Sequence, residues 1–204
     1  MSRTLTASDR SALIKLASSF PAGSPERKAI LAGLSQTPTH KTAAGDVNVP
    51  GKHIFDNAQV AGRAEVRDNA QVRNHAKVTG YAQVSGDAQV LGAAKVSGSA
   101  QVHSNAVVSG DAVVFSNAVV GGDALVYGFA NVSDFAKVYG RAEVYGDVHV
   151  FGNAKVFGNA RVLGNALVSD FARIGGTAII MGGNWDGSEG RIISGKWKAP
   201  GVPA

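Results

Sequence analysis

The chain has 204 residues and a formal net charge of +5, and only 17% of its residues are charged. It contains no cysteine, which excludes disulfides, thiol chemistry and cysteine-ligated metal sites. We find no signal peptide and no apolar run of the roughly 18 residues that a membrane span requires. We therefore expect a cytoplasmic protein with no membrane partner. The basic residues are scattered, a pattern that does not favour a nucleic-acid partner.

Residues 1–36 predict a pair of short helices. Leu13 and Leu16 lie on the apolar face of the first helix, and Ser24-Pro25-Glu26 is a typical start for the second. Neither helix is long enough to be stable alone, so we expect the pair to dock on another protein or on a neighbouring subunit. Residues 37–53 contain two prolines and no periodicity, which indicates a linker.

Residues 54–182 carry a repeat of six residues. An aliphatic residue recurs at every sixth position from Ile54 to Ile180, giving 22 positions without interruption, and we call these residues anchors. Two residues before each anchor after the first lies alanine in 20 of 21 cases, with Val148 as the exception. Two residues after each anchor lies Gly, Asp, Asn or Ser, and 15 of these 22 residues are Gly. Such a pattern predicts one continuous solenoid.

When the repeats are aligned, these three recurring positions form columns, and the columns predict how each repeat folds. Residues two apart in a strand point to the same side, so the alanine and the anchor should both face inward. The Gly-rich position then turns a corner, because Gly, Asn and Asp tolerate positive φ. Three such units close into a triangular coil of 18 residues, and about seven coils stack into a prism of parallel strands. The expected class is all-β.

Residues 183–204 break the period and predict a C-terminal cap. Asp186-Gly187 is a typical hairpin turn, so we expect a short hairpin around it. Both tryptophans of the chain, Trp185 and Trp197, lie in this segment. We interpret them as a hydrophobic lid, since the end of a solenoid must be covered. A role in stacking against a ligand is the alternative.

The A-x-V-x-G phase resembles the hexapeptide-repeat superfamily of left-handed β-helices, whose best-known members are trimeric acyltransferases. Within that superfamily the pattern is most similar to uncharacterised bacterial and prophage proteins that are called transferases by fold alone. The resemblance implies a left-handed, single-stranded parallel β-helix and a trimer. It also implies a phage or virion association.

The resemblance makes His103 and His149 the catalytic candidates if the chain is an enzyme, since transferases of this fold use a histidine as base. In the predicted columns, however, neither has a carboxylate in the coil above or below it. No insertion interrupts the coils to build an acceptor pocket. The histidines also lie in different columns, which does not predict a metal site. We therefore assign no catalytic residue, metal or cofactor.

Apolar side chains gather on the outward positions of one face. A contiguous exposed apolar surface indicates an interface. The predicted interface residues are Val107, Leu125, Tyr127, Tyr145, Leu163 and Met181. On another face Lys137, Lys155 and Arg173 stack in one outward column, where solubilisation and polyanion binding are the two interpretations.

From these observations we expect a non-catalytic structural or interaction protein that forms a homo-oligomer, a trimer first. The alternative is an acyltransferase of the acetyl-CoA type. A third hypothesis is a carbohydrate-binding module that uses the exposed aromatic residues.

Overall fold

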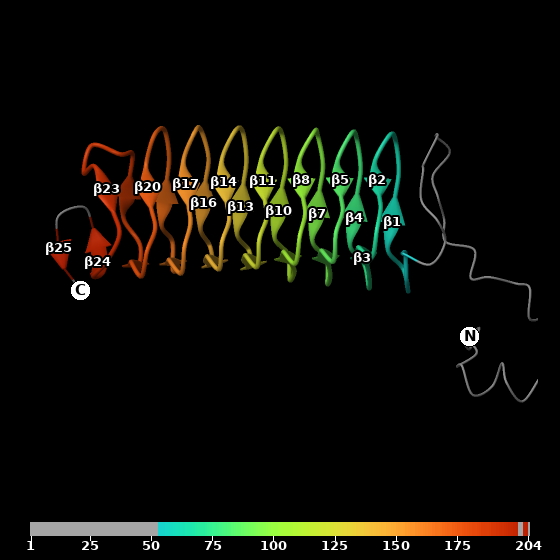
Figure 1. Cartoon of the computed structure of the whole chain (residues 1–204), viewed down its shortest axis with the longest axis horizontal. Helices are drawn as coiled ribbons and strands as arrows, with labels where there is room; N and C mark the ends of the chain where they lie inside the picture. Colours follow the sequence, from blue (N-terminus) through green and yellow to red (C-terminus); the bar gives the residue numbers. More distant parts are fainter. Residues whose placement is uncertain (1–52, 200–201, 204) are drawn as a thin grey trace, which may run out of the picture. The chain divides into compact units, whose positions relative to one another are not determined.

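The structure is a computed structural model that describes residues 53–199 and 202–203. Within these residues the chain is a parallel β-solenoid of about eight coils, and Figure 1 shows the coils following one another along a single axis. The described residues contain no helix, and so none that is long and apolar enough to cross a membrane. The predicted helical pair at 1–36 and nearly all of the linker at 37–53 lie outside the described residues.

Short strands form three parallel sheets, and each coil contributes one strand to each sheet. The first sheet contains β1 Gln59–Val60, β4 Lys77–Val78, β7 Lys95–Val96, β10 Val113–Val114, β13 Asn131–Val132, β16 His149–Val150, β19 Leu167–Val168 and β22 Asn184–Trp185. The second contains β2 Glu65–Val66, β5 Gln83–Val84, β8 Gln101–Val102, β11 Val119–Val120, β14 Lys137–Val138, β17 Lys155–Val156, β20 Arg173–Ile174 and β23 Arg191–Ile192. The third contains β3 Gln71–Val72, β6 Gln89–Val90, β9 Val107–Val108, β12 Leu125–Gly128, β15 Glu143–Gly146, β18 Arg161–Val162, β21 Ile179–Ile180, β24 Lys196–Ala199 and β25 Val202–Pro203.

Strand pairing confirms the coil of 18 residues. Val60 pairs with Val78 in the first sheet, and Val126 pairs with Val144 in the third. Backbone groups join the coils in the same register, as where the N–H of Lys137 donates to the carbonyl oxygen of Ala154 over 2.9 Å. Because a two-residue strand is marginal alone, these bonds between coils hold the fold together.

The predicted columns face the interior. From Ala64 to Val168, every anchor and every residue two before it is 0% exposed. Val148 is equally buried in the alanine column. Each residue two after an anchor, from Asp56 to Gly182, has a positive φ. The assignment of inward and corner positions from the repeat is therefore confirmed.

The C-terminal segment differs from its prediction. Asp186-Gly187 does not turn a hairpin, because the flanking strands β22 and β23 belong to different sheets and pair in parallel with the preceding coil. Residues 184–199 instead form a further coil, which makes about eight in place of seven. An antiparallel pair does close the structure, but it joins β24 to β25.

Candidate functional site

The outer face of the third sheet carries the predicted interface residues. Val107 and Leu125 are register partners on β9 and β12, and Tyr127 and Tyr145 are register partners on β12 and β15. The two tyrosine rings stack with centroids 4.8 Å apart and planes 5° from parallel. Leu163 and Met181 directly follow β18 and β21. All six residues therefore lie along the third sheet. Leu125 is 36% exposed and the other five side chains are half-buried.

One ion pair lies within this apolar face. The guanidinium Nε of Arg161 donates to Glu143 Oε2 over 3.0 Å, and its Nη2 donates to the Tyr145 hydroxyl over 3.0 Å. The Glu143 carboxylate, with a smaller contribution from Tyr145, raises the pKa of Arg161 above its usual range. Partial burial, followed by the neighbouring Tyr145 and Glu143, raises the pKa of the Tyr127 hydroxyl. The face therefore combines apolar contact area with one fixed cation, as protein interfaces commonly do.

The two candidate histidines lie on different faces and are not brought together. His103 follows β8 of the second sheet, and its ring lies across Gly121 in the next coil with Nδ1 3.1 Å from the Ser104 hydroxyl. His149 is exposed on β16 of the first sheet, between Asn131 and Leu167. As predicted, the residues stacked next to them, Gly121 for His103 and Asn131 and Leu167 for His149, carry no carboxylate.

A carboxylate does approach His149, but from the bend that precedes its strand. Asp147 Oδ1 lies 3.7 Å from His149 Nε2, and both side chains are solvent-exposed. The predicted columns do not reveal this contact, because they align residues of neighbouring coils and not residues of the same coil. The separation of only two residues along the chain is the signal that identifies it.

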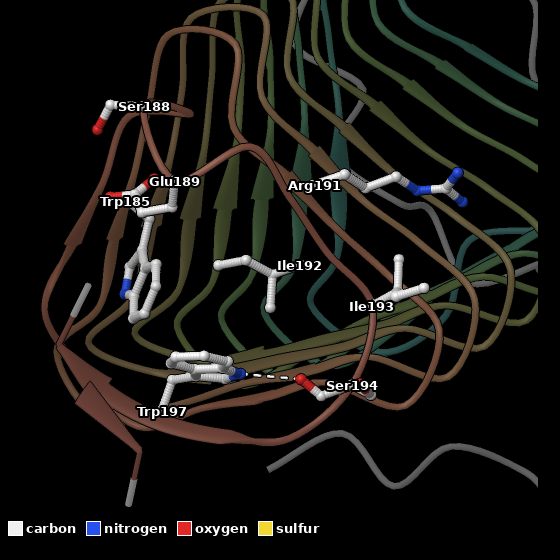
Figure 2. A pocket seen from close by; sticks show the side chains of 8 residues that line it. All are labelled: Trp185, Ser188, Glu189, Arg191, Ile192, Ile193, Ser194 and Trp197. Atoms are coloured by element: carbon white, nitrogen blue, oxygen red, sulfur yellow. Dashed lines mark hydrogen bonds between the residues drawn. The ribbon is translucent and has the colours of Figure 1, made fainter. Parts of the chain in front are cut away.

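A hollow lies at the C-terminal end of the solenoid, and neither candidate histidine lines it. Its volume is about 480 Å³. It is lined by Trp185, Ser188, Glu189, Arg191, Ile192, Ile193, Ser194 and Trp197. Figure 2 shows Trp185, Ile192 and Trp197 pointing into the last coil while Arg191 points away from it.

The tryptophans occupy anchor positions of this last coil. Trp185 pairs with Val168 and Trp197 with Ile180, so both side chains continue the inward columns. Trp185 is 1% exposed, and its indole N–H donates to the Gly182 carbonyl oxygen over 2.8 Å. Trp197 is half-buried and donates to the Ser194 carbonyl oxygen over 2.9 Å. Their rings meet edge to face with centroids 6.3 Å apart, and both side chains line the hollow.

Within residues 53–199, no three His, Asp or Glu side chains come together as metal ligands. Comparison of the chain with protein-family models, with curated proteins and with solved structures gives no match in any of the three.

Proposed function

We propose that the protein is a non-catalytic structural and interaction module that self-associates through the outer face of the third sheet. The observation that carries this proposal is the set of six apolar side chains on that face, centred on the stacked Tyr127 and Tyr145. Exposed apolar area of this continuity is typical of protein interfaces. The constant strand register supports it, because outward side chains of successive coils form one row that a second copy can contact.

We propose a trimer as the assembled state, following the resemblance described from the sequence. The protomer mass is 20.8 kDa, so three copies give 3 × 20.8 = 62.4 kDa. Size exclusion with light scattering at micromolar concentration measures this mass. A monomer of 20.8 kDa under these conditions contradicts the proposal.

A charge placed on the face is expected to break the assembly. Val107→Glu introduces an unpaired carboxylate beside Leu125. Association would bury this carboxylate, and the cost of removing it from water would oppose association. We expect this variant to elute as a monomer. Val119→Glu is the matched control, because Val119 is also half-buried one residue before an anchor, but it lies on the second sheet. Equal dissociation in the two variants would assign the assembly to a different surface.

The second candidate function is acyl transfer with His149 as the base, which the nearby Asp147 favours. Two features oppose it. From β1 to β21 the coils keep the 18-residue register with no insertion that shapes an acceptor pocket, and the hollow at the C-terminal end does not include His149. We therefore expect no heat of binding when the protein is titrated with acetyl-CoA. Binding that His149→Ala abolishes would instead support the enzyme.

A further inference from the structure

A column of four basic side chains runs along the second sheet. Lys137, Lys155, Arg173 and Arg191 occupy the outward position before the anchor on β14, β17, β20 and β23. Three are exposed and Lys155 is half-buried. The preceding four strands of this sheet carry Glu65, Gln83, Gln101 and Val119 at the same position, so the cations are confined to the C-terminal half. Arg191 extends the predicted column of three, and the sequence alone did not place it because the period changes after Ile180.

The part of the chain that the structure describes places no carboxylate against this column. Among the described residues, none of its four cations has a carboxylate oxygen within 4.0 Å, whereas the equivalent column of the third sheet pairs Glu143 with Arg161 at 3.0 Å. Like charges on neighbouring strands repel each other across the strand spacing and lower stability. The fold thus tolerates a repulsion that it does not compensate internally, and an external polyanion would remove it.

Aromatic rings border the basic column on both sides. Tyr139 and Phe157 lie two residues after Lys137 and Lys155, and their rings stack at 5.5 Å. Two residues before Lys137 and Arg173 lie Phe135 and Phe171, which are 59% and 73% exposed. Arg191 covers the Phe157 ring at 5.0 Å from its centroid. The result is a straight basic strip between exposed apolar edges.

The spacing of the strip distinguishes between linear polyanions. Successive cations are one strand spacing apart, about 4.7–4.9 Å, and form one row, so they suit an extended polymer that carries an acid group on every repeating unit, as a polyuronate does. Phosphates of duplex DNA recur every 3.4 Å of helix axis on each strand and wind around that axis, so they do not match a straight row of cations. Single strands bind by stacking consecutive bases on aromatic platforms. Here Tyr139 and Phe157 stack on each other, and the exposed Phe135 and Phe171 are two coils apart.

We propose that this strip binds an extended acidic polysaccharide, with its carboxylates on the four cations and the apolar faces of its sugar rings against the bordering aromatic side chains. The site is separate from the proposed self-association face, which lies on the third sheet. Binding therefore does not depend on the oligomeric state proposed above.

The test uses the full chain and an oligogalacturonate long enough to span the four strands. The ionic strength is about 0.15 M, because exposed charges further apart than roughly 8 Å are then screened. Dextran is the neutral probe and oligothymidylate the nucleic-acid probe, and calorimetry measures the affinity. We expect Lys155→Gln with Arg173→Gln to weaken oligogalacturonate binding by roughly tenfold or more, since half the cations of the strip are removed. The matched control is Lys77→Gln with Lys95→Gln, an adjacent pair on the first sheet with the same change in charge.

Two further variants test the sugar contact. Phe171→Ala is expected to weaken binding of oligogalacturonate, while Phe129→Ala, at a corner 67% exposed, leaves it unchanged. All the altered side chains are outside the core, so melting temperatures should stay close to that of the parent. The proposal is overturned if oligogalacturonate does not bind, or if the two double variants lose the same affinity. It is also overturned if Phe171→Ala leaves the affinity unaltered. Oligothymidylate binding as tight as that of oligogalacturonate would assign the strip to nucleic acid instead.

Discussion

At the scale of single residues, the corners bring the backbones of neighbouring coils close together. A Cβ on Gly122 would lie 2.8 Å from the carbonyl oxygen and 2.9 Å from the nitrogen of Gly140 in the next coil. At four of the seven corners without glycine, a side-chain oxygen accepts a backbone N–H of the next coil. The Asp134 carboxylate accepts from the Gly152 N–H at 3.1 Å, and the Asn74 side-chain oxygen accepts from the Gly92 N–H at 3.2 Å. Corner Asp and Asn thus satisfy a backbone donor that a methyl group leaves unpaired.

We therefore predict an unusual order of stability at Gly122, whose φ is +69°. Gly122→Ala adds a methyl that meets backbone atoms and favours no αL conformation, and we expect it to destabilise the protein by about 1–3 kcal/mol. Gly122→Asn is larger, but it tolerates αL and can accept the N–H of Gly140, so its loss should be smaller. Denaturant unfolding of both variants measures the difference. If Ala is the better tolerated residue, side-chain hydrogen bonding does not explain the non-glycine corners.

At the scale of elements, the strands were predictable because every six residues repeat the same three requirements. An inward anchor such as Val126, an inward alanine and a corner residue define each strand without reference to distant sequence. The last coil was not predicted because its anchors are unevenly spaced. Trp185 follows Ile180 by five residues, Ile192 follows Trp185 by seven, and Trp197 follows Ile192 by five. Loops of unequal length absorb these differences at the corners.

The hairpin predicted at Asp186-Gly187 was wrong for a physical reason. Asp186 Oδ1 accepts the Ser188 N–H at 2.8 Å, and this bond from Ser188 lowers the pKa of the Asp186 carboxyl. Gly187 has a φ of +100°. The same local chemistry serves a hairpin or a corner, so only the inward direction of Trp185 and Ile192 distinguishes them. The Asp147–His149 contact was not predicted either, because it joins a bend to the strand that follows it, whereas the predicted columns relate residues of neighbouring coils.

The cluster on β12, β15 and β18 predicts how stability changes at high pH. The raised pKa of Tyr127 means that the folded state holds this proton more tightly than the unfolded chain does. The corresponding stability is present below the unfolded pKa of about 10 and is lost as the pH rises through the raised folded pKa. We expect the free energy of unfolding to fall less steeply above about pH 10 in Tyr127→Phe than in the parent protein. Tyr81→Phe, at a ring that is 59% exposed, controls for the loss of one hydroxyl, and an equal effect there would contradict the assignment to burial.

At the scale of the whole molecule, the solenoid is a row of coils that contact only their neighbours. Each central strand pairs with one strand before it and one after it, as β11 does with β8 and β14. Stability in such a row is close to a sum of coil and neighbour terms, so opening can begin at an end and leave the centre intact. The end coil is therefore held by what it packs against, and Trp185 and Trp197 are its largest inward side chains.

This organisation predicts a local response to a change in the last coil. Trp185 is fully buried and meets the Trp197 ring edge to face, so Trp185→Ala should remove about 3–5 kcal/mol of packing there. We expect native-state hydrogen exchange to lose protection in β22–β24 and, to a lesser degree, in β19–β21. Protection in β10–β12 should persist, because no contact of those strands changes. Val120→Ala, at a central anchor, is the contrasting variant, since it weakens coils on both sides of β11. An equal loss of protection along all three sheets in Trp185→Ala would mean that the solenoid opens as one cooperative unit and that its end is not an independent cap.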